Sequence, residues 1–440
     1  MRKWFFPELS VPLLVVRDPI AIAIIWAGFW WQLWPPSGYR TFIVIMALVM
    51  GASGVLQLLL DSRLNWPVVV FGWRTYILHL PVIFVAARTL TAKDLEVIGR
   101  WCCRIAPPMI VLCYLQYYAG ADSLWNTGAG KDAAQIAFEG EKVRASGTFS
   151  FATGTACFFA LVAAFAWAQI ALPYQSRRDR IISFVALFAC IAFMPVSGGR
   201  LGMFMVGIVV ACGAVMILRS KYFVYIAVAL LGLYGLSKVS FFNDAVESMS
   251  ARLESARIFE NEQSDWGFWA RVAGGFRTPL DAIGEVPLFI GFGLGLGTQA
   301  GAALAGSAGD FLLGEGEWDR ILGECGWTLG MLYIAFRVWI TMDLFRRAIR
   351  AILQQSYWLP LLLWSGGAWT MLQGQVGQPT NLGFFVVNVA VVMIALKGNP
   401  LIVTPEWFTW NRLRVSRLRD RRAFGRSSPP TALGNPPTRL

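Results

Sequence analysis

Long uninterrupted apolar runs occupy most of the chain between Ile20 and Leu396. A helix needs about 20 apolar residues to cross the hydrocarbon of a bilayer, and several runs reach that length. Only 15% of the residues are charged, against roughly a quarter in soluble domains, so a water-facing fold with a single core is excluded. The runs also lack the alternation of apolar and polar residues that is typical of barrel strands. Helices are therefore the structure that satisfies the backbone hydrogen bonds in lipid.

The sequence therefore predicts an all-α polytopic membrane protein with about eleven transmembrane helices, within a range of ten to twelve. The apolar runs place these helices at residues 18–34, 41–60, 67–87, 98–118, 148–172, 181–196, 201–218, 222–239, 320–342, 357–373 and 381–396.

Lys and Arg residues near the helix ends predict the orientation, because cytoplasmic loops are enriched in them. Basic groups at 177–180, 219–221 and 346–350 and the basic tail fall on one side of the membrane, which we assign to the cytoplasm. The opposite side receives residues 119–146 and one large, partly helical loop, 240–319. Strict alternation of eleven helices puts the N-terminus outside, whereas Arg2 and Lys3 favour the inside, and a twelfth helix near Val11 would reconcile the two.

Four regions follow: N-terminal transmembrane helices at 1–239, a periplasmic loop at 240–319, C-terminal transmembrane helices at 320–398 and a basic cytoplasmic tail at 399–440, for which we predict disorder. Such a tail could bind nucleic acid, but on a membrane protein it is typical of contact with anionic lipid. We expect membrane lipids and no nucleic acid among the partners.

The sequence offers little for metal or cofactor binding. It contains one histidine, His79, and no His, Cys or carboxylate cluster with metal-ligand spacing, so we predict no metal and no cofactor. Four glycines alternate from Gly291 to Gly297. They indicate either a turn where backbones pack closely or a nest of backbone N–H groups for phosphate. His79 and Arg74 lie inside a predicted span, where ionisable groups are functional candidates, although a lone packed histidine is the commoner outcome.

Two groups of polar residues are candidates for chemistry on the loop side. The first is Arg144, Arg200, Arg271 and Arg277. Each could pair with a loop carboxylate, but four arginines together on the side that disfavours them indicate an anionic, phosphate-bearing ligand. The second is Glu317, Arg320 and Glu324, which helical spacing places on one face. They form either an acidic first turn neutralised by Arg320 or a general base held at the membrane surface.

Four segments, spread over about residues 95–396, resemble the bacterial O-antigen ligase and O-antigen polymerase family. They are Arg144 with the following Gly147-Thr148-Phe149, Ser-Gly-Gly-Arg-Leu-Gly at 197–202, Pro-Leu-Phe-Ile-Gly-Phe-Gly at 287–293, and Leu-Gly-Glu-Cys-Gly-Trp-Thr-Leu-Gly at 322–330. The resemblance implies a metal-independent membrane glycosyltransferase, similar to the C-superfamily, that uses undecaprenyl-pyrophosphate-linked glycans. It also implies that arginines hold the pyrophosphate while a base on the loop activates the acceptor.

The chain departs from the ligases of this family, which carry a histidine where it has Glu315-Gly316-Glu317-Trp318. We therefore expect Glu315 or Glu317 to act as the base, with Arg320 and Glu324 orienting it, and we favour polymerisation of exopolysaccharide or O-antigen repeat units. The alternatives are a ligase that moves glycan to another acceptor and a flippase for lipid-linked sugars. We expect a multi-pass protein of the bacterial inner membrane, with polysaccharide export or chain-length proteins as partners.

Overall fold

The computed structural model describes residues 16–34, 38–61, 64–127, 142–171, 176–218, 284–306 and 316–398, together with Trp4 and single positions between 245 and 281. The predicted span at 222–239, the residues Arg271 and Glu315, and the tail at 399–440 lie outside the described residues.

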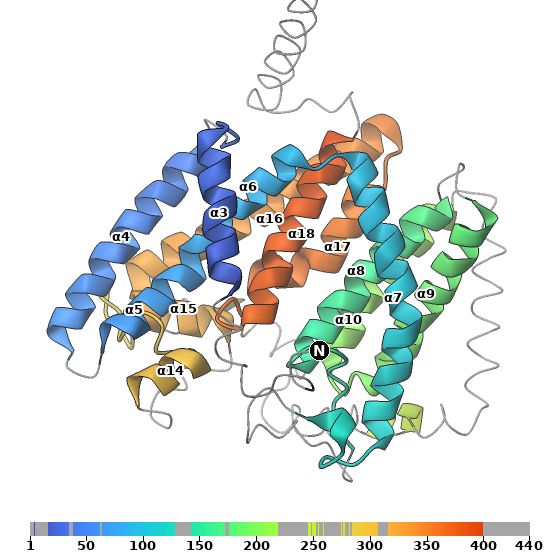
Figure 1. Ribbon diagram of the computed structural model, residues 1–440, viewed down its shortest axis with the longest axis horizontal. Coiled ribbons are helices and arrows are strands. Elements are labelled where there is room, and N and C mark those ends of the chain that lie inside the picture. Colours follow the sequence, from blue (N-terminus) through green and yellow to red (C-terminus); the bar gives the residue numbers. More distant parts are fainter. Residues whose placement is uncertain are drawn as a thin grey trace, which may run out of the picture.

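The described chain is almost entirely helical, which confirms the all-α prediction (Figure 1). The helices are α3 (Arg17–Trp30), α4 (Gly38–Leu60), α5 (Trp66–Trp73), the π-helix η1 (Arg74–Leu78), α6 (Leu80–Thr89), α7 (Ala92–Tyr118), the 3-10 helix η2 (Leu124–Asn126), α8 (Ala152–Ala171), α9 (Arg177–Val196), α10 (Arg200–Leu218), α14 (Gln299–Ala305), α15 (Glu317–Cys325), α16 (Trp327–Gln355), α17 (Leu359–Gln373) and α18 (Pro379–Lys397).

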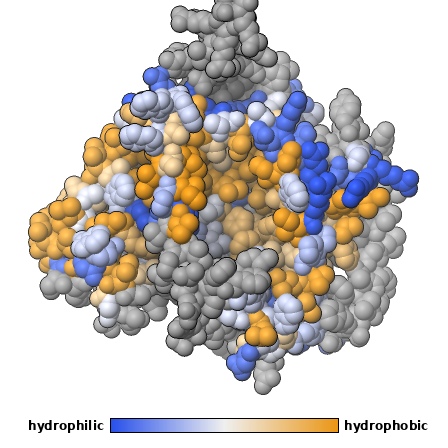
Figure 2. Space-filling view, in the orientation of Figure 1, coloured by the Kyte–Doolittle hydropathy of each residue, from blue (hydrophilic) through white to orange (hydrophobic). Residues whose placement is uncertain are grey.

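Seven helices of the described part are long and apolar enough to cross a membrane. They are α4, the continuous run α5–η1–α6, α7, α8, α9, α16 and α18, and α10 is a shorter apolar helix. The outer faces of α3 and α4 expose large apolar side chains such as Trp26, Phe29 and Leu48, and Figure 2 shows hydrophobic residues over much of the visible surface. A soluble protein rarely exposes so much apolar area, so the chain is a helical membrane protein.

The helices α5, α7 and α9 begin at residues whose side chains satisfy one of the first N–H groups. Thr91 and Asp94 form a reciprocal capping box at the start of α7, and the Ser176 hydroxyl accepts a hydrogen bond from the Asp179 N–H at the start of α9. Asn65 caps α5 in the same way. These caps fix where the apolar helices enter the bundle.

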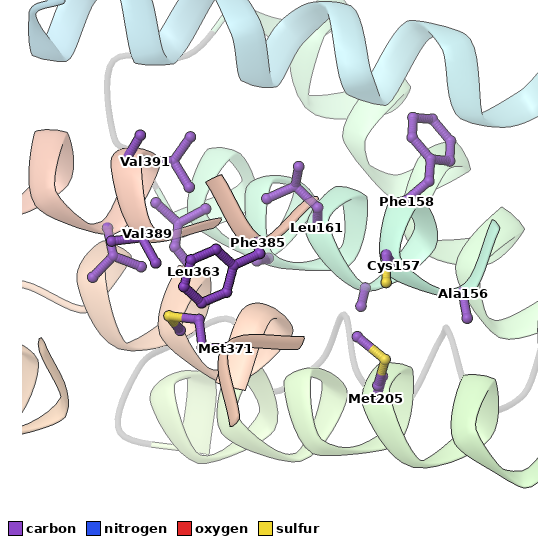
Figure 3. Close-up of a cluster of buried hydrophobic side chains, with 14 of the residues drawn as sticks. Ala156, Cys157, Phe158, Leu161, Met205, Leu363, Met371, Phe385, Val389 and Val391 are labelled. Carbon is purple, nitrogen blue, oxygen red and sulfur yellow. The ribbon is translucent and has the colours of Figure 1, made fainter. Parts of the chain in front are cut away.

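The core of the bundle is built around α8, which is buried along nearly its whole length. In Figure 1, α4 lies at one flank and α9 at the other, with α8, α17 and α18 between them. Figure 3 shows the apolar side chains that α8, α17 and α18 contribute to the middle of the bundle, among them Leu161, Leu363 and Phe385. A helix that is hydrophobic on all sides belongs in such a core.

The last predicted loop-to-span boundary was placed wrongly. A single helix was expected over 320–342, but α15 ends at Cys325 and α16 begins at Trp327 and continues to Gln355. Gly326 separates them with a φ of 83°, a conformation that disfavours residues with a Cβ. The N–H groups of Trp327 and Thr328 then bond to the carbonyl groups of Pro287 and Leu288 instead of continuing the helix.

The end of the predicted loop packs into the bundle. Leu294 and Leu296 are buried, and the Gln57 side chain of α4 bonds to the Leu294 N–H at 2.8 Å and to the Gly291 carbonyl at 3.2 Å. A Cβ on Gly72 of α5 would lie 2.5 Å from the Gly295 nitrogen, so the two backbones are in direct contact. The segment 291–298 is therefore part of the helical core.

Candidate functional site: a buried charge network and the predicted arginines

Helix α15 brings Glu317, Arg320 and Glu324 together, as the spacing predicted. The Arg320 guanidinium donates to Glu317 Oε1 at 2.8 Å through Nη2, to Glu317 Oε2 at 3.0 Å through Nε, and to Glu324 Oε2 at 3.0 Å through Nη1. All three side chains are buried. The acidic first turn and its arginine thus form a closed, fully desolvated pair of salt bridges rather than a solvated helix end.

Two further residues complete the network, and the sequence analysis did not identify them. Arg337 of α16 donates through Nη1 to Glu317 Oε1 at 3.2 Å. Its other nitrogens bond to the Met371, Thr370 and Gly374 carbonyl groups at the end of α17. The Tyr76 hydroxyl donates to Glu324 Oε2 at 2.7 Å and accepts from Arg320 Nη1 at 3.0 Å. Arg337 could have been recognised as an arginine in the middle of an apolar run.

The network balances two guanidinium groups with two carboxylates, which makes burial of these charges tolerable. Glu317 accepts four hydrogen bonds, the last from the Val376 N–H at 3.0 Å, and its side chain is fully buried. Three of these bonds end on Oε1 and one on Oε2. The geometry of this carboxylate indicates a role in holding α15, α16 and the end of α17 together.

Glu324 differs from Glu317 in having an unused oxygen. Its Oε1 is shielded from solvent and has no hydrogen-bond partner among the described residues. A Cβ on Gly297 would lie 2.7 Å from this oxygen, so only a glycine lets the 291–298 segment pass beside it. The N–H groups of Phe292 and Leu294 bond to Gly323 and Gln57. These bonds favour close backbone packing over a phosphate nest for the glycine run.

Arg144 lies outside this network, on a short segment between α7 and α8. The Gln116 side chain of α7 fixes the segment, since it donates to the Gly147 carbonyl at 3.0 Å and accepts from the Gly147 N–H at 2.7 Å. Gly147 has a φ of 54°, and Met109 leaves no room for a side chain there. Arg144 is half-buried, and its Nε is shielded and lacks a hydrogen-bond partner within the described residues. Burial lowers the pKa of its guanidinium, because the charged form loses hydration.

The remaining predicted arginines occupy different environments. Arg200 is the first residue of α10 and follows a turn in which the Ser197 hydroxyl bonds to the Met194 and Gly199 carbonyl groups. Arg277 is exposed and pairs with Asp281 at 3.4 Å. For this arginine the structure therefore shows the pairing with a loop carboxylate that the sequence analysis left open. Arg271 and Glu315 lie outside the described residues.

Residues 374–381 run from the end of α17 into the first turn of α18, and they contact both the charge network and the starts of other helices. Val376 contacts Glu317, and a Cβ on Gly377 would lie 3.2 Å from the Arg320 guanidinium. The Thr153 hydroxyl at the start of α8 is 3.5 Å from Gln378, and Arg17 donates to the Pro379 carbonyl at 2.7 Å. The beginnings of α3, α8, α15 and α18 therefore meet at one end of the bundle.

The chain matches no protein-family model and no curated protein. Its chemistry must therefore be argued from the residues themselves. No group of His, Cys, Asp and Glu side chains within the described ranges could hold a metal ion. The arrangement instead offers a charge-balanced network and, separately, the half-buried Arg144, whose Nε has no hydrogen-bond partner among the described residues.

Proposed function

We propose that this protein is a membrane glycosyltransferase that polymerises exopolysaccharide or O-antigen repeat units on the periplasmic face of the bacterial inner membrane. Its donor is an undecaprenyl-pyrophosphate-linked oligosaccharide, and the reaction uses neither metal nor nucleotide. The observation that carries the proposal is Arg144. Its guanidinium is half-buried with an unpartnered Nε, and it lies on the clamped segment that includes the Gly-Thr-Phe similar to the O-antigen family.

In the proposed reaction, an acceptor sugar hydroxyl attacks the anomeric carbon of the donor. The bond between that carbon and the pyrophosphate oxygen breaks, the hydroxyl proton passes to a base, and undecaprenyl pyrophosphate leaves. Charge accumulates on the leaving pyrophosphate, so preorganised guanidinium groups lower the barrier. Arg144 and Arg200 supply them, together with Arg271 and Arg277. The exposed Arg277–Asp281 pair is weak enough for a phosphate to displace the carboxylate.

The buried network changes the assignment of the base. Glu317 already accepts four hydrogen bonds and has no exposed surface, so we assign it, with Arg320 and Glu324, to positioning the helix starts. Glu315, two residues earlier in the chain, is then the proposed base. Because the catalytic carboxylate must alternate between protonated and ionised forms, the four hydrogen bonds that Glu317 accepts make it a poor candidate for the role.

The two alternatives differ in the product that they form. A ligase would move the same glycan from undecaprenyl pyrophosphate to a different acceptor. A flippase would move the lipid-linked sugar across the bilayer and leave its bonds unchanged. The α15 network argues against a charged path through this part of the bundle, because its charges pair with one another.

The test is glycan synthesis by purified protein in nanodiscs. The substrate is the lipid-linked repeat unit extracted from cells that lack this protein, in which unpolymerised units accumulate. We expect a ladder of longer glycans without added metal or nucleotide. Arg144→Ala and Arg200→Ala should each lower the rate by about 10²-fold or more, the typical loss of a donor to a developing anion. Arg144→Lys should recover part of it, because lysine keeps the charge but not the planar fork.

Arg104→Ala is the matched control. Arg104 pairs with Asp179 at 3.2 Å and lies on α7, on a different part of the bundle from Arg144. Its removal should leave the rate unchanged. Full activity in both Arg144→Ala and Arg200→Ala would exclude the proposed pyrophosphate site. Glycan transfer to an acceptor other than the lipid-linked repeat unit, without elongation, would show a ligase.

A further inference from the structure

A second buried cluster of charges lies where the π-helix η1 of the α5–η1–α6 run meets the start of α3. Arg74 Nε is 2.9 Å from Asp18 Oδ2, and His79 Nε2 is 3.5 Å from Asp18 Oδ1. Arg17 Nε lies 3.7 Å from the same Asp18 oxygen. Two guanidinium groups and one imidazole thus gather around a single carboxylate.

Arg74 is the group that this cluster leaves incomplete. Only 7% of the residue is exposed, and its Nη1 and Nη2 atoms are shielded without a hydrogen-bond partner among the described residues. The Phe71 ring lies 4.5 Å from the guanidinium carbon, which covers one face of the group. A buried donor without an acceptor is destabilising, because it has lost its bonds to water. An anion placed against these two nitrogens would supply the missing acceptors.

The local backbone explains how this group is separated from the α15 network. In the π-helix Arg74–Leu78, the wider turn places Arg74 and His79, five residues apart, against Asp18. Tyr76, between them, points instead to Glu324 and Arg320. π-helical turns inside α-helices are frequent at functional sites. The π-helical turn therefore contacts Asp18 through Arg74 and the α15 network through Tyr76. Arg74 takes no part in that network or in the proposed glycosyl transfer.

The position of the cluster indicates what kind of anion it can receive. Arg74 lies eight residues from the first residue of its span, or about 12 Å along the helix, at the end where Arg17 meets Pro379. Beyond Asp18, the helix α3 exposes Ile20, Ile22 and Trp26 on its surface, which offers apolar contacts close to the cluster. A ligand that joins this surface to the guanidinium needs an anionic head and apolar chains.

We propose that Arg74, with Arg17 beside it, binds the phosphate group of a membrane lipid that lies along α3. Two parallel N–H donors of one guanidinium match two oxygens of a phosphate. Asp18 holds Arg74 through Nε and leaves both Nη atoms for the ligand. The site is distinct from Arg144 and does not depend on glycosyl transfer, since any phosphate-headed lipid satisfies this chemistry.

The experiment measures lipid binding to the purified full-length protein in detergent, by native mass spectrometry and by the shift in thermal unfolding temperature. The probes are dioleoyl phosphatidic acid, dioleoylglycerol, which has the same chains without phosphate, and inorganic phosphate. Wild-type protein should retain phosphatidic acid and unfold at a higher temperature with it. Dioleoylglycerol and inorganic phosphate should have little effect.

Two substitutions should act in opposite directions. Arg74→Gln should weaken the affinity for phosphatidic acid by about 10–100-fold, the loss of a charge-assisted contact. Asp18→Asn removes the competing carboxylate, so it should lower the stability of the lipid-free protein and raise the affinity. Arg104→Gln, which removes a guanidinium on another part of the bundle, should leave the affinity unchanged.

The two variants are expected to change the affinity in opposite directions. If Arg74→Gln does not fold, Asp18→Asn still tests the proposal, because it must bind phosphatidic acid more tightly than the wild-type protein. Unchanged affinity in Arg74→Gln, or unchanged or weaker affinity in Asp18→Asn, would overturn the site. Equal stabilisation by inorganic phosphate would overturn its assignment to lipid. Loss of binding in Arg144→Ala instead would place the lipid phosphate at the other arginine.

Discussion

Glu317→Gln should severely destabilise the protein, because Glu317 is the acceptor that Arg320 and Arg337 share. The substitution keeps the size of the side chain and removes its charge. Two buried guanidinium groups would then face one carboxylate, Glu324. The new amide N–H₂ would also point at donors, since the wild-type oxygens accept from both arginines and from the Val376 N–H.

Breaking one partner of a buried ion pair costs about 3–5 kcal/mol, because a charge remains without compensation. The Glu317 side chain is fully buried and the Arg320 side chain is 6% exposed, so little screening by water reduces this cost. The exposed pair Arg277–Asp281 gives the matched control, since its side chains are 73% and 61% exposed. Asp281→Asn should cost less than about 1 kcal/mol.

The assay is unfolding in mixed micelles with an increasing fraction of sodium dodecyl sulfate, followed by tryptophan fluorescence. Glu317→Gln should shift the midpoint far more than Asp281→Asn. Adding Arg337→Met to Glu317→Gln restores the charge balance, so the double variant should lose less stability than the two single losses combined. Equal shifts for Glu317→Gln and Asp281→Asn, or strict additivity in the double variant, would refute the description of the network as a closed set of charges.

Three further predictions concern packing and topology. Tyr76→Phe should cost about 1–3 kcal/mol in the same unfolding assay, because it removes the hydroxyl between Glu324 and Arg320, and no loss would contradict that contact. Gly72→Ala should cost about 1–3 kcal/mol because its Cβ meets the Gly295 backbone, whereas Gly207→Ala, which meets nothing within 4 Å, should be neutral or stabilising. In spheroplasts, an impermeant maleimide should label Asp281→Cys but not Arg347→Cys, because basic residues such as those at 346–350 favour the cytoplasmic side. Labelling of Arg347→Cys but not of Asp281→Cys would show the opposite orientation. The native cysteines among the described residues are buried or partly buried, so their background should be low.

Local features of the site could be predicted from the sequence. Glu317, Arg320 and Glu324 share a face because helix geometry alone fixes positions three and seven residues apart, and their mutual contacts follow. The all-α membrane class followed from the length of the apolar runs in the same way, and seven long apolar helices bear it out.

The partners of that face could not be predicted, because they come from distant parts of the chain. Arg337 reaches Glu317 from α16, and Tyr76 reaches Glu324 from η1 across 248 residues. The glycine run shows the same limit. The sequence of Gly291–Gly297 fitted both a closely packed turn and a phosphate-binding nest. The contacts of this segment with Gly72 and Glu324 favour the closely packed turn. An arginine amid apolar residues, as in Arg337 and Arg74, was the one available sign of a buried charged cluster.

Binding of undecaprenyl pyrophosphate, the lipid that the proposed transfer releases, tests the central claim most directly because it requires no knowledge of the sugars. Wild-type protein in nanodiscs should bind this lipid more tightly than undecaprenol, which has the same chain without pyrophosphate. Arg144→Ala should remove most of the difference, by about 10-fold or more, while Arg104→Ala should keep it. Equal affinity for undecaprenol and undecaprenyl pyrophosphate in the wild-type protein would contradict a pyrophosphate site at this end of the bundle.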